Sequence, residues 1–438
     1  MVKIKGVDRT IVICFLLIAS RFGWAGQTYD VTSTLDEIDA DTSDGVCETA
    51  AHTCTLRAAV MQASAAGGAA VSVNLPAGTY LLTRPIDGTG SENGGSLKLA
   101  PPSNGMTTVS IVGASAETTI IDAGQIDRVF SIEFPRVATF SNITVRNGYA
   151  LTDVGGGIFD DGFLTLDHVI VSGNQADYGG GVYNGQGTLS IDASSIVSNV
   201  ATQSGGGVFS LDPLTITAST LANNAAMRGG GLEVRDSSII VNTTIANNYA
   251  TDSGGGLYAM QDNGTATNLY NSTVAYNEAD SDQNNVGSGG GIGVDAAKGN
   301  LNIYNTLVAG NFHINPAFAD DCAGPLRTHA FNLFGNISQC AITQVSGTYA
   351  ILNTLTYLGP LQDNGGPTAT IALLPGSNAI DGAAQTCLDA YSNPIVTDQR
   401  AFPRDLGRCD IGAFEFDSVD QHDLIFQDGF ELPPPPVH

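Results

Sequence analysis

Residues 174–199 read NQADYGGGVYNGQGTLSIDASSIVSN, and the pattern then returns up to Asn224 as VATQSGGGVFSLDPLTITASTLANN. Each stretch holds a Gly-Gly-Gly triplet followed by an aliphatic residue, and each ends in asparagine. Triplets begin at Gly155, Gly179, Gly205, Gly229, Gly254 and Gly289, at intervals of 24, 26, 24, 25 and 35 residues. Self-similarity at such a period is the signature of a solenoid, in which chain length counts coils rather than separate domains.

Two aliphatic columns keep their place relative to the asparagine that ends each repeat. These asparagines are Asn174, Asn199, Asn224, Asn248, Asn277 and Asn311. The residue eight positions earlier is always Leu or Ile, and the residue three positions earlier is always Val, Ile or Leu. Alternation such as Leu189-Ser190-Ile191 indicates short strands, about three of them in each unit. The sequence therefore predicts an all-β fold, a parallel β-helix.

Stacking of the coils would place equivalent residues ~4.8 Å apart. Equivalent aliphatic residues then form inner rows, and equivalent asparagines form a ladder of side-chain amides. The glycine triplets would supply positive φ and close backbone approach at a corner. The longest interval predicts one extra loop of roughly ten residues around Asp280–Val286. A propeller is the alternative, but its blades need ~40 residues or more, and a sandwich needs longer strands joined by Asn-Gly type turns.

Residues 71–147 predict less regular early coils. Their strand candidates are Val71–Leu75, Thr79–Thr83, Thr108–Gly113, Thr118–Asp122, Val129–Phe134 and Thr139–Arg146. Upstream of them, Leu56, Ala59, Val60 and Ala63 recur at helical spacing, and Gly67-Gly68 provides a stop. This pattern predicts a short N-terminal helix that caps the solenoid, whose open edge would otherwise invite aggregation.

Composition and charge exclude several classes of protein. The 438 residues include 17 Lys and Arg against 43 Asp and Glu, a formal net charge of −26. A chain this acidic repels a phosphate backbone, so nucleic acid is not expected as a partner. A hydrophobic content of 42% is too high for a disordered acidic polymer. The 53 glycines lack the three-residue period of collagen.

Residues 1–25 are predicted to be a secretory signal peptide. Basic residues precede an apolar run over Thr10–Ala19, and Gly23-Trp24-Ala25 places small residues before a cleavage site after Ala25. The run is too short for a membrane-spanning helix, although a short anchor is the alternative. We therefore expect a secreted, extracellular or cell-surface protein without a transmembrane segment, and a monomer.

Six cysteines remain in the exported chain and fall into three local pairs. An even count in an oxidising compartment indicates disulfides. Six cysteines allow fifteen pairings, and proximity favours Cys47–Cys54, Cys322–Cys340 and Cys387–Cys409. Metal ligation is the alternative, although no histidine accompanies the cysteines at zinc spacing.

One acidic stretch is a candidate for a structural Ca²⁺ site. Asp39, Asp41 and Asp44 cluster just before Gly45, and hard oxygen ligands suit calcium. The spacing is not that of an EF-hand loop, and a solvated acidic turn is the alternative. No other cofactor is expected.

The stretch Cys54-Thr55-Leu56-Arg57-Ala58-Ala59 is similar to the CSLREA motif, with Thr55 in place of Ser and Ala58 in place of Glu. The acidic lead-in over Asp41–Cys47 fits the same family. This resemblance implies an N-terminal cap, residues 26–70, on a secreted bacterial β-helix that is right-handed and single-stranded. The repeats within residues 71–311 resemble those of polymorphic outer-membrane proteins and of other pectate-lyase-like (pectin lyase-like) β-helices.

Residues 312–416 resemble the domain called choice-of-anchor Q. The matching stretches are Leu358–Leu361, Asp363–Thr368, Leu373–Asp381, Thr397–Arg404 and Cys409–Glu415. Asn378 stands where the family usually has Pro, and Ala401 where it usually has Gly. Neither family has a settled biochemical role, so the resemblance implies architecture and not an activity. Residues 417–438 end in Pro433–Pro436 and predict an exposed, extended tail.

Parallel β-helices also host polysaccharide lyases, which need an acidic Ca²⁺ cluster beside an Arg or Lys. Between the first triplet and Asn311 the cations are Arg228, Arg235 and Lys298. Arg228 and Arg235 could flank one face, but no carboxylate trio recurs beside them at coil spacing. The sequence therefore names no lyase site.

Glycoside hydrolases of this fold need carboxylates that converge within ~5–9.5 Å. Asp160-Asp161 is the doublet in the repeat region, but neighbours on a strand point to opposite faces. His168 lies in a strand candidate, Leu164–Val169, without a flanking glycine. We interpret all three as exposed coil residues, and we assign no catalytic residue.

A rigid rod with a polar exterior is typical of adhesion or glycan contact. Its candidate exposed aromatic residues are Tyr183, Phe209, Tyr258, Tyr270 and Tyr276. Their alternative role is packing against the next coil. The sequence thus predicts an exported surface or extracellular protein, adhesin-like and non-enzymatic, whose partner is a polysaccharide or a cell surface. The alternative is a polysaccharide lyase or glycoside hydrolase that acts on an acidic glycan.

Overall fold

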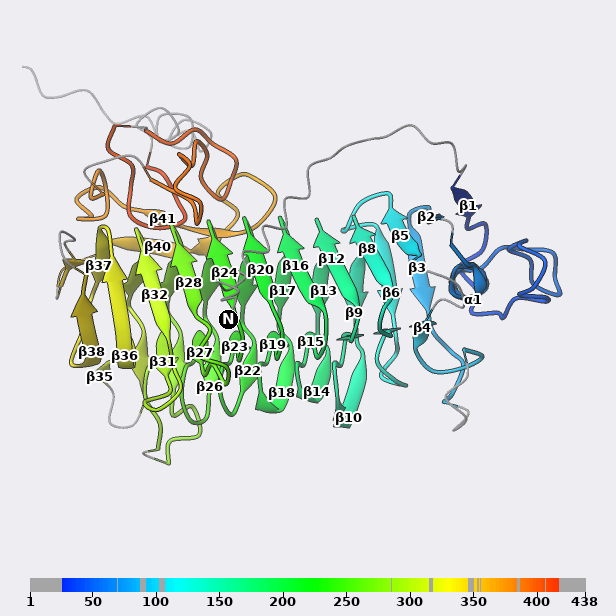
Figure 1. The fold of residues 1–438 in the computed structure, drawn as a ribbon, viewed down its shortest axis with the longest axis horizontal. Coiled ribbons are helices and arrows are strands. Elements are labelled where there is room, and N and C mark those ends of the chain that lie inside the picture. The colour runs from blue at the N-terminus through cyan, green and yellow to red at the C-terminus, as the bar shows by residue number, and fades with distance from the viewer. Residues whose placement is uncertain are drawn as a thin grey trace, which may run out of the picture.

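The computed structural model describes residues 26–416 apart from residues 69, 87–91, 102–106, 285, 315–317, 346–349, 353, 355, 384–386 and 406. The predicted signal peptide and the Pro-rich tail lie outside the described residues. Within these residues, short parallel strands stack into one long right-handed β-helix, and a helix lies at its N-terminal end (Figure 1). The predicted fold class is confirmed.

Each coil in the middle of the rod presents four strands, which define four faces. Face A comprises β4 (Leu97–Leu99), β7 (Phe130–Ile132), β11 (Ile158–Asp160), β15 (Val182–Asn184), β19 (Val208–Ser210), β23 (Leu232–Val234), β27 (Leu257–Ala259) and β31 (Ile292–Val294). Face B comprises β1 (Gln27–Asp30), β2 (Val71–Leu75), β5 (Thr108–Gly113), β8 (Val137–Ser141), β12 (Phe163–Asp167), β16 (Thr188–Asp192), β20 (Leu214–Thr217), β24 (Ser238–Val241), β28 (Thr267–Tyr270), β32 (Leu301–Tyr304), β36 (Cys322–His329) and β38 (Gln339–Gln344).

Face C follows face B around each coil, and face D completes the turn. Face C comprises β3 (Gly78–Leu81), β6 (Thr119–Asp122), β9 (Thr144–Arg146), β13 (Ile170–Ser172), β17 (Ser195–Val197), β21 (Thr220–Ala222), β25 (Thr244–Ala246), β29 (Thr273–Ala275), β33 (Leu307–Ala309), β37 (Asn332–Phe334) and β39 (Ala350–Ile351). Face D comprises β10 (Tyr149–Val154), β14 (Gln175–Tyr178), β18 (Val200–Ser204), β22 (Ala225–Ala226), β26 (Tyr249–Ala250), β30 (Glu278–Ala279), β34 (Phe312–His313) and the antiparallel β35 (Phe318–Ala319).

The prediction of three strands per coil was wrong, because a single residue with positive φ is enough to turn the chain between faces B and C. The predicted strand Thr139–Arg146 is in fact two strands, β8 and β9, separated at Asn142 with φ 56°. Asn and Asp tolerate this conformation better than most residues. The alternation of buried residues shifts by one position at this corner, from Phe140 to Ile143, and a single predicted strand overlooks that shift.

Both predicted aliphatic columns lie in the core. The earlier column, on face B, is Leu166, Ile191, Ile216, Ile240, Leu269 and Ile303, and the later column, on face C, is Val171, Ile196, Leu221, Ile245, Val274 and Val308. Every one of these side chains is 0% exposed. Burial at ~25 cal/mol per Å² of apolar surface makes these rows the main source of stability.

The asparagines form the predicted ladder. The amide Nδ2 of each donates to Oδ1 of the next over 2.9–3.0 Å, from Asn174 to Asn311. Each Oδ1 also accepts the backbone N–H of the preceding asparagine, as Asn224 does from Asn199 over 3.0 Å. A second amide hydrogen goes to a carbonyl of the preceding coil, such as that of Ile196 over 2.8 Å. The ladder ends on a carboxylate, because Asn311 donates to Asp321 over 2.9 Å.

The glycine triplet is required at the corner where the chain of each coil passes beside the asparagine ladder. A Cβ on Gly206 would lie 2.4 Å from the carbonyl oxygen of Ala225 in the next coil. A Cβ on Gly207 would lie 2.6 Å from the carbonyl oxygen of Gly231 and 3.0 Å from the Asn224 amide. Gly205 has φ +64°, a conformation that suits glycine. Glycine is therefore required at Gly206 and Gly207 because there is no room for a Cβ atom, and not because of the backbone torsion angles.

The helix α1 (Leu56–Ala65) packs against β2 and β4 at the N-terminal end of the rod. The Thr55 hydroxyl caps it by accepting the N–H of Ala58. Arg57 is 1% exposed and pairs with Asp36 over 2.6 Å. No helix among the described residues is long and apolar enough to cross a membrane.

All three predicted cysteine pairs are disulfides: Cys47–Cys54, Cys322–Cys340 and Cys387–Cys409. The parallel stacking extends beyond the predicted limits of 71 and 311, because β1 pairs with β2, and β37 pairs with β39. Residues 356–416 then leave the stack and lie over face C, where β40 (Leu358–Gln362) pairs with β41 (Thr370–Leu373) (Figure 1).

The extra length in the longest repeat is divided between two connections instead of one. Seven residues, 260–266, link β27 to β28, whereas three, 235–237, link the equivalent strands one coil earlier. Nine residues, 280–288, follow β30, whereas three follow β26 before the next triplet. The single loop predicted around Asp280–Val286 is thus only the larger of two insertions.

We predict that Asn224→Ala lowers the free energy of unfolding by about 3 kcal/mol, because it leaves buried donors and acceptors on both sides of the ladder unpaired. The measurement is the midpoint of urea unfolding. The matched control is Asn223→Gly, since Asn223 is exposed with φ 56° and glycine keeps that conformation at a cost below ~1 kcal/mol. Equal shifts for both variants would contradict the structural role of the ladder.

Candidate functional site

The middle residue of each face-A strand points outward, and strand register aligns these residues into one row. The outer row is Lys98, Ser131, Phe159, Tyr183, Phe209, Glu233, Tyr258 and Gly293. Consecutive members are direct neighbours in adjacent coils. The row therefore runs along the rod axis at coil spacing and is the candidate site.

Three rings of the outer row stack on one another. The centroids of Phe159 and Tyr183 are 5.8 Å apart at an interplanar angle of 9°, and those of Tyr183 and Phe209 are 5.6 Å apart at 13°. Guanidinium groups close the stack at its two ends, with Arg128 5.2 Å from the Phe159 centroid and Arg235 5.2 Å from the Phe209 centroid. Phe159 and Tyr183 are partly exposed, whereas Phe209 is 3% exposed, so solvent reaches this stack mainly at its first two rings.

Glu233 takes the place of a ring in the next coil. Its side chain is 0% exposed, although it projects from the outer side of β23. Oε1 accepts from Nε of Arg235 over 2.9 Å and lies 2.8 Å from its NH2 group. Oε2 is buried without a hydrogen-bond partner, as is Nε of Arg228. The guanidinium of Arg228 lies 5.5 Å from the centroid of the Tyr258 ring.

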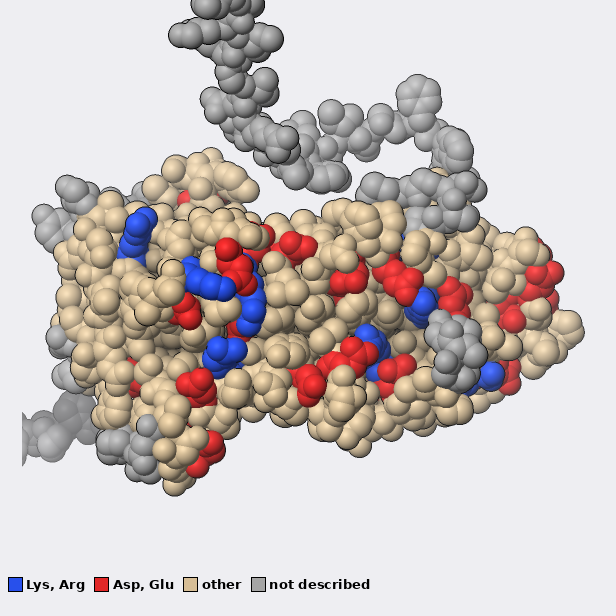
Figure 2. All heavy atoms as spheres, turned by 60° about the horizontal axis from the view of Figure 1, so that its bottom comes forward, with Lys and Arg blue, Asp and Glu red and all other residues tan. Residues whose placement is uncertain are grey.

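Charged residues from two connections border this part of the row. Asp262 lies 3.9 Å from Arg235 and also pairs with Lys298. Asp295 accepts the backbone N–H groups of Ala297 and Lys298, and these bonds hold the pKa of its carboxyl below the ordinary value although burial raises it. Figure 2 shows basic and acidic side chains gathered along the surface turned toward the viewer.

The structure thus brings together more charge than the sequence indicated. Arg228 and Arg235 both lie against rings of the outer row, as the sequence allowed, and Lys298 lies beside them through its pair with Asp262. Three carboxylates accompany these cations: Glu233, Asp262 and Asp295. The sequence missed this trio because two members come from connections of unequal length rather than from equivalent strand positions. Among the described residues, no group of three or more His, Cys, Asp or Glu is arranged to hold a metal ion.

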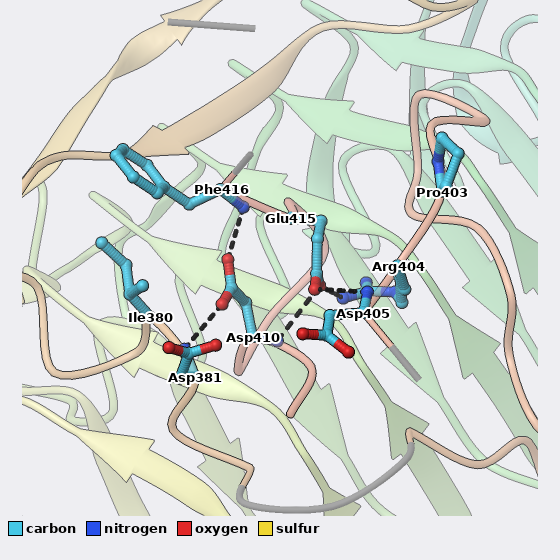
Figure 3. Close-up of a pocket in the computed structure, with 8 residues that line it drawn as sticks. All are labelled: Ile380, Asp381, Pro403, Arg404, Asp405, Asp410, Glu415 and Phe416. Carbon is cyan, nitrogen blue, oxygen red and sulfur yellow. Dashed lines mark hydrogen bonds and ion pairs between the residues drawn. The ribbon is translucent and has the colours of Figure 1, made fainter. Parts of the chain in front are cut away.

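A second candidate is a pocket of about 500 Å³ in the C-terminal region (Figure 3). It is lined by Ile380, Asp381, Pro403, Arg404, Asp405, Asp410, Glu415 and Phe416. Asp410 accepts the backbone N–H groups of Asp381, over 2.7 Å, and of Phe416. Glu415 accepts from Arg404 over 2.9 Å and from the N–H of Asp405 over 2.9 Å. Through these hydrogen bonds, both carboxylates hold neighbouring turns of the chain in place.

Burial changes the protonation of this pocket. It raises the pKa of Asp410 to about 7, and the neighbouring Glu415 adds to the rise. Burial likewise raises the pKa of Glu415, against the opposing effect of Arg404. The pocket can hold protons near neutral pH, but its two buried carboxyl groups, Asp410 and Glu415, are both occupied by hydrogen bonds within the protein.

The three candidate calcium ligands surround an amide nitrogen instead. Nε2 of Gln62 lies 2.8 Å from Asp39 Oδ1, 2.9 Å from the Asp41 carbonyl and 3.3 Å from Asp44 Oδ1. Gln62 belongs to α1 and is 1% exposed. These contacts hold the acidic loop to the helix, and a calcium site there stays a prediction.

The interpretation of Asp160 as an exposed coil residue was wrong. Asp160 is 0% exposed, its Oδ1 accepts the N–H of Gly162 over 2.9 Å, and burial raises its pKa well above the ordinary value. It is the third residue of β11, in register with the buried Ile132 and Asn184, so strand alternation points its side chain inward. His168 is half exposed and pairs with Asp167 over 2.6 Å, and Asp161 is half-buried.

Most of the candidate exposed aromatic residues pack instead. Phe209, Tyr258 and Tyr270 are 3%, 9% and 8% exposed, because each lies against a neighbour from an adjacent coil. Tyr276 donates its hydroxyl hydrogen bond to the carbonyls of Leu358 and Gly359, over 3.1 and 3.2 Å, and so holds β40 to face C. Tyr183 is half-buried and keeps an open edge.

No family model matches this chain, and no curated protein does. Among solved structures, the chain is similar to the crystal structure of pectate lyase Pel9A, with 13% sequence identity and a TM-score of 0.46. The similarity covers 90% of this chain and 98% of the other.

We predict that the protein is about 3 kcal/mol more stable to urea at pH 5 than at pH 8. Burial raises the pKa of Asp321 to about 6 and that of Asp410 to about 7. The folded state therefore holds protons that the unfolded chain releases, so this stability is complete below the ordinary carboxyl pKa and is lost as the pH rises through 6 and 7.

High salt provides the control for this pH profile. The net charge of −26 also favours compaction at lower pH, but salt screens that exposed part and leaves the buried carboxyl groups largely unaffected. A profile that is flat in high salt would contradict the assignment to Asp321 and Asp410.

Proposed function

We propose that the protein is an exported, non-enzymatic β-helix that contacts a glycan along the outer row of face A. The observation that supports this most directly is the row itself. It is a straight series of aromatic and charged side chains at coil spacing, on a rod whose coils are fixed by a buried amide ladder. A linear polymer is the ligand class that such a series suits.

The placement of the C-terminal region favours this face. Residues 356–416 attach to face C through polar contacts: Thr220 to the carbonyl of Ala369 over 2.5 Å, and Thr244 to Gln399 over 2.6 Å. Residues 356–416 therefore cover part of face C, and Figure 2 shows basic and acidic side chains gathered on the surface turned toward the viewer. We also propose that residues 26–70 form a CSLREA-type cap and that residues 312–416 form a choice-of-anchor Q domain, as their sequence resemblance implies.

Export is part of the same proposal. The predicted signal peptide at residues 1–25 would deliver the chain to an oxidising compartment, and three disulfides are compatible with that destination. We propose a secreted or cell-surface location on this basis.

A second candidate function is cleavage of an acidic glycan. The observation that favours it is the gathering of Arg228, Arg235 and Lys298 with three carboxylates on face A. Against it, Asp262 is paired with cations and Asp295 is bonded to backbone N–H groups. A general base or nucleophile must be available to the substrate, so we rank this function below binding.

We predict that the mature protein binds a subset of a broad glycan array and that Tyr183→Ala weakens this binding by about fivefold or more, near 1 kcal/mol. The physical reason is loss of the open ring edge and hydroxyl in the middle of the row. Binding is measured on the array and confirmed by calorimetry with the best glycan.

The matched control is Tyr391→Ala, because Tyr391 is 78% exposed and lies in the C-terminal region. The control variant should bind like the unaltered protein. Absence of binding to any glycan would overturn the proposal. Release of new sugar ends from acidic glycans, with or without Ca²⁺, would replace it with the enzymatic alternative.

A further inference from the structure

The first residue of each parallel face-D strand projects outward, and strand register aligns these residues coil by coil from β10 to β34. The residue that follows each of them is alanine, or His313 in the last coil, and it faces the core with at most 7% exposure. The outward residues form the face-D row: Tyr149, Gln175, Val200, Ala225, Tyr249, Glu278 and Phe312.

Large apolar side chains occupy every second position of the face-D row. Tyr149, Val200, Tyr249 and Phe312 are 38%, 42%, 39% and 37% exposed. Each lies two coils from the next, which is ~9.6 Å along the rod at the spacing of adjacent strands. Polar or small residues stand between them, so the fold itself does not require a large apolar side chain at this position. Single exposed apolar residues are normal, but an aligned and evenly spaced series marks an interaction surface.

The three rings of the face-D row do not stack on one another. Within the part of the chain that the structure describes, no ring stacking and no cation–π contact involves Tyr149, Tyr249 or Phe312. The C-terminal region lies over face C and leaves face D open, along the lower edge of the rod in Figure 1. The exposed part of each ring is therefore available to the apolar surface of a ligand.

Amide side chains accompany the rings. Asn247 directly precedes Tyr249, and Asn223 directly precedes Ala225, each at a corner with positive φ of 54° and 56°. Among the described residues, the side chains of Asn223, Asn247 and Gln175 make no hydrogen bond. A primary amide both donates and accepts. The row thus combines apolar rings with hydrogen-bonding groups that suit hydroxyls.

The surroundings of the face-D row are acidic rather than basic. Among the described residues in and beside the face-D strands, carboxylates outnumber cations. The carboxylates include Asp153, Asp177, Asp252 and Asp282, and the cations are Arg128, which pairs with Asp153, and Arg228. A polyanion and a second copy of this chain, with its net charge of −26, are both repelled by such a surface. An uncharged ligand is not.

We propose that the face-D row binds an uncharged, extended polysaccharide, of the kind found in the β-1,4-linked chains of cellulose and chitin. In such a chain every second sugar turns the same side toward the protein, so the repeat spans two sugar residues and is close in length to two coils. The C–H groups on one side of a sugar are apolar and pack on an aromatic ring. Hydroxyls at the edge of the sugar bond to the neighbouring amides.

This inference goes beyond the proposed function. It adds a second surface, face D, with a neutral ligand, and it does not require that a glycan lie along face A. The two surfaces can therefore be tested with separate substitutions, Tyr183→Ala for face A and Tyr249→Ala for face D.

The experiment uses the full mature chain and two extended polysaccharides. The protein is mixed with insoluble cellulose or insoluble chitin, and the bound fraction is measured after sedimentation. Calorimetry with cellohexaose and N-acetylchitohexaose gives the affinities and distinguishes the two sources, and maltohexaose serves as a curved, α-linked control. One or both extended chains should bind, and maltohexaose should not. Tyr249→Ala should weaken binding by about fivefold or more, because it removes a ring from the middle of the series.

Two further variants separate spacing from apolar character. Tyr391→Ala is the matched control, since Tyr391 is 78% exposed and lies outside the row, and its affinity should stay within about twofold of the unaltered protein. Combining Tyr249→Ala with Ala225→Tyr keeps the number of rings but moves one ring by a single coil, so it should not recover binding. Urea unfolding of each variant shows that loss of binding is not loss of fold.

Three results would overturn the proposal. One is unchanged affinity of Tyr249→Ala for the extended chains, and another is full recovery of binding in the double variant, which would make the two-coil spacing irrelevant. The third is an unaltered protein that binds neither extended chain, or binds maltohexaose equally well. If the protein then self-associates and Tyr249→Ala abolishes this, the row is a contact between copies.

Failure of the proposed function gives a different result. Glycan binding would then be unchanged in Tyr183→Ala but weakened in Tyr249→Ala, so face A would be no glycan site while the face-D row remained one. The reverse pattern would leave the proposed function in place and remove the face-D row.

Discussion

The hydrogen bond from one asparagine amide to the next is the interaction on which the rest of the rod depends. It sets the spacing of the coils at one corner and occupies the space beside it, where Cβ atoms on the second and third glycines of each triplet would collide with the next coil or with the amides themselves. Ladder and triplet therefore require each other. Because a side chain in one coil lies directly above its copy in the coil before, every other row of the molecule inherits this register.

Because equivalent residues stack in register, the residue type at one position in successive coils determines what a row on the surface contains. On face A, aromatic residues at one position in three successive coils become a stack, and Glu233 in the fourth coil becomes a buried carboxylate between two rings. Exposed ion pairs contribute little on their own. A carboxylate that is 0% exposed needs a cation, and Arg235 supplies it from the next turn of chain. Arg228 is the second arginine of the same coil, and its guanidinium lies 5.5 Å from the centroid of the Tyr258 ring.

The repeat was predictable because it obeys spacing rules that a sequence shows directly. The inner columns, the ladder, the helix Leu56–Ala65 and the three disulfides were all predicted from intervals and alternation. The fourth strand of each coil was not, because the two-residue corner at Asn142 and Ile143 shifts the alternation of buried residues by only one position, so two strands resemble one longer strand. The charged trio was not either, because Asp262 and Asp295 lie in connections whose length varies from coil to coil. Burial of Asp160 was missed because a charged residue occupies an inward-facing position of face A, whose register neighbours are Ile132 and Asn184.

The direction of the ladder explains how the solenoid can end. From Asn174 onward every amide donates to the coil that follows, so the last amide needs an acceptor that does not itself have to donate onward. Asp321 fills this role, because a carboxylate only accepts: one oxygen takes the Asn311 amide and backbone N–H, and the other takes the N–H of Asn336 over 2.6 Å. An asparagine in its place would carry an amide with no next rung to receive it. Burial raises the pKa of Asp321 to about 6, which makes the end of the ladder its most proton-sensitive rung.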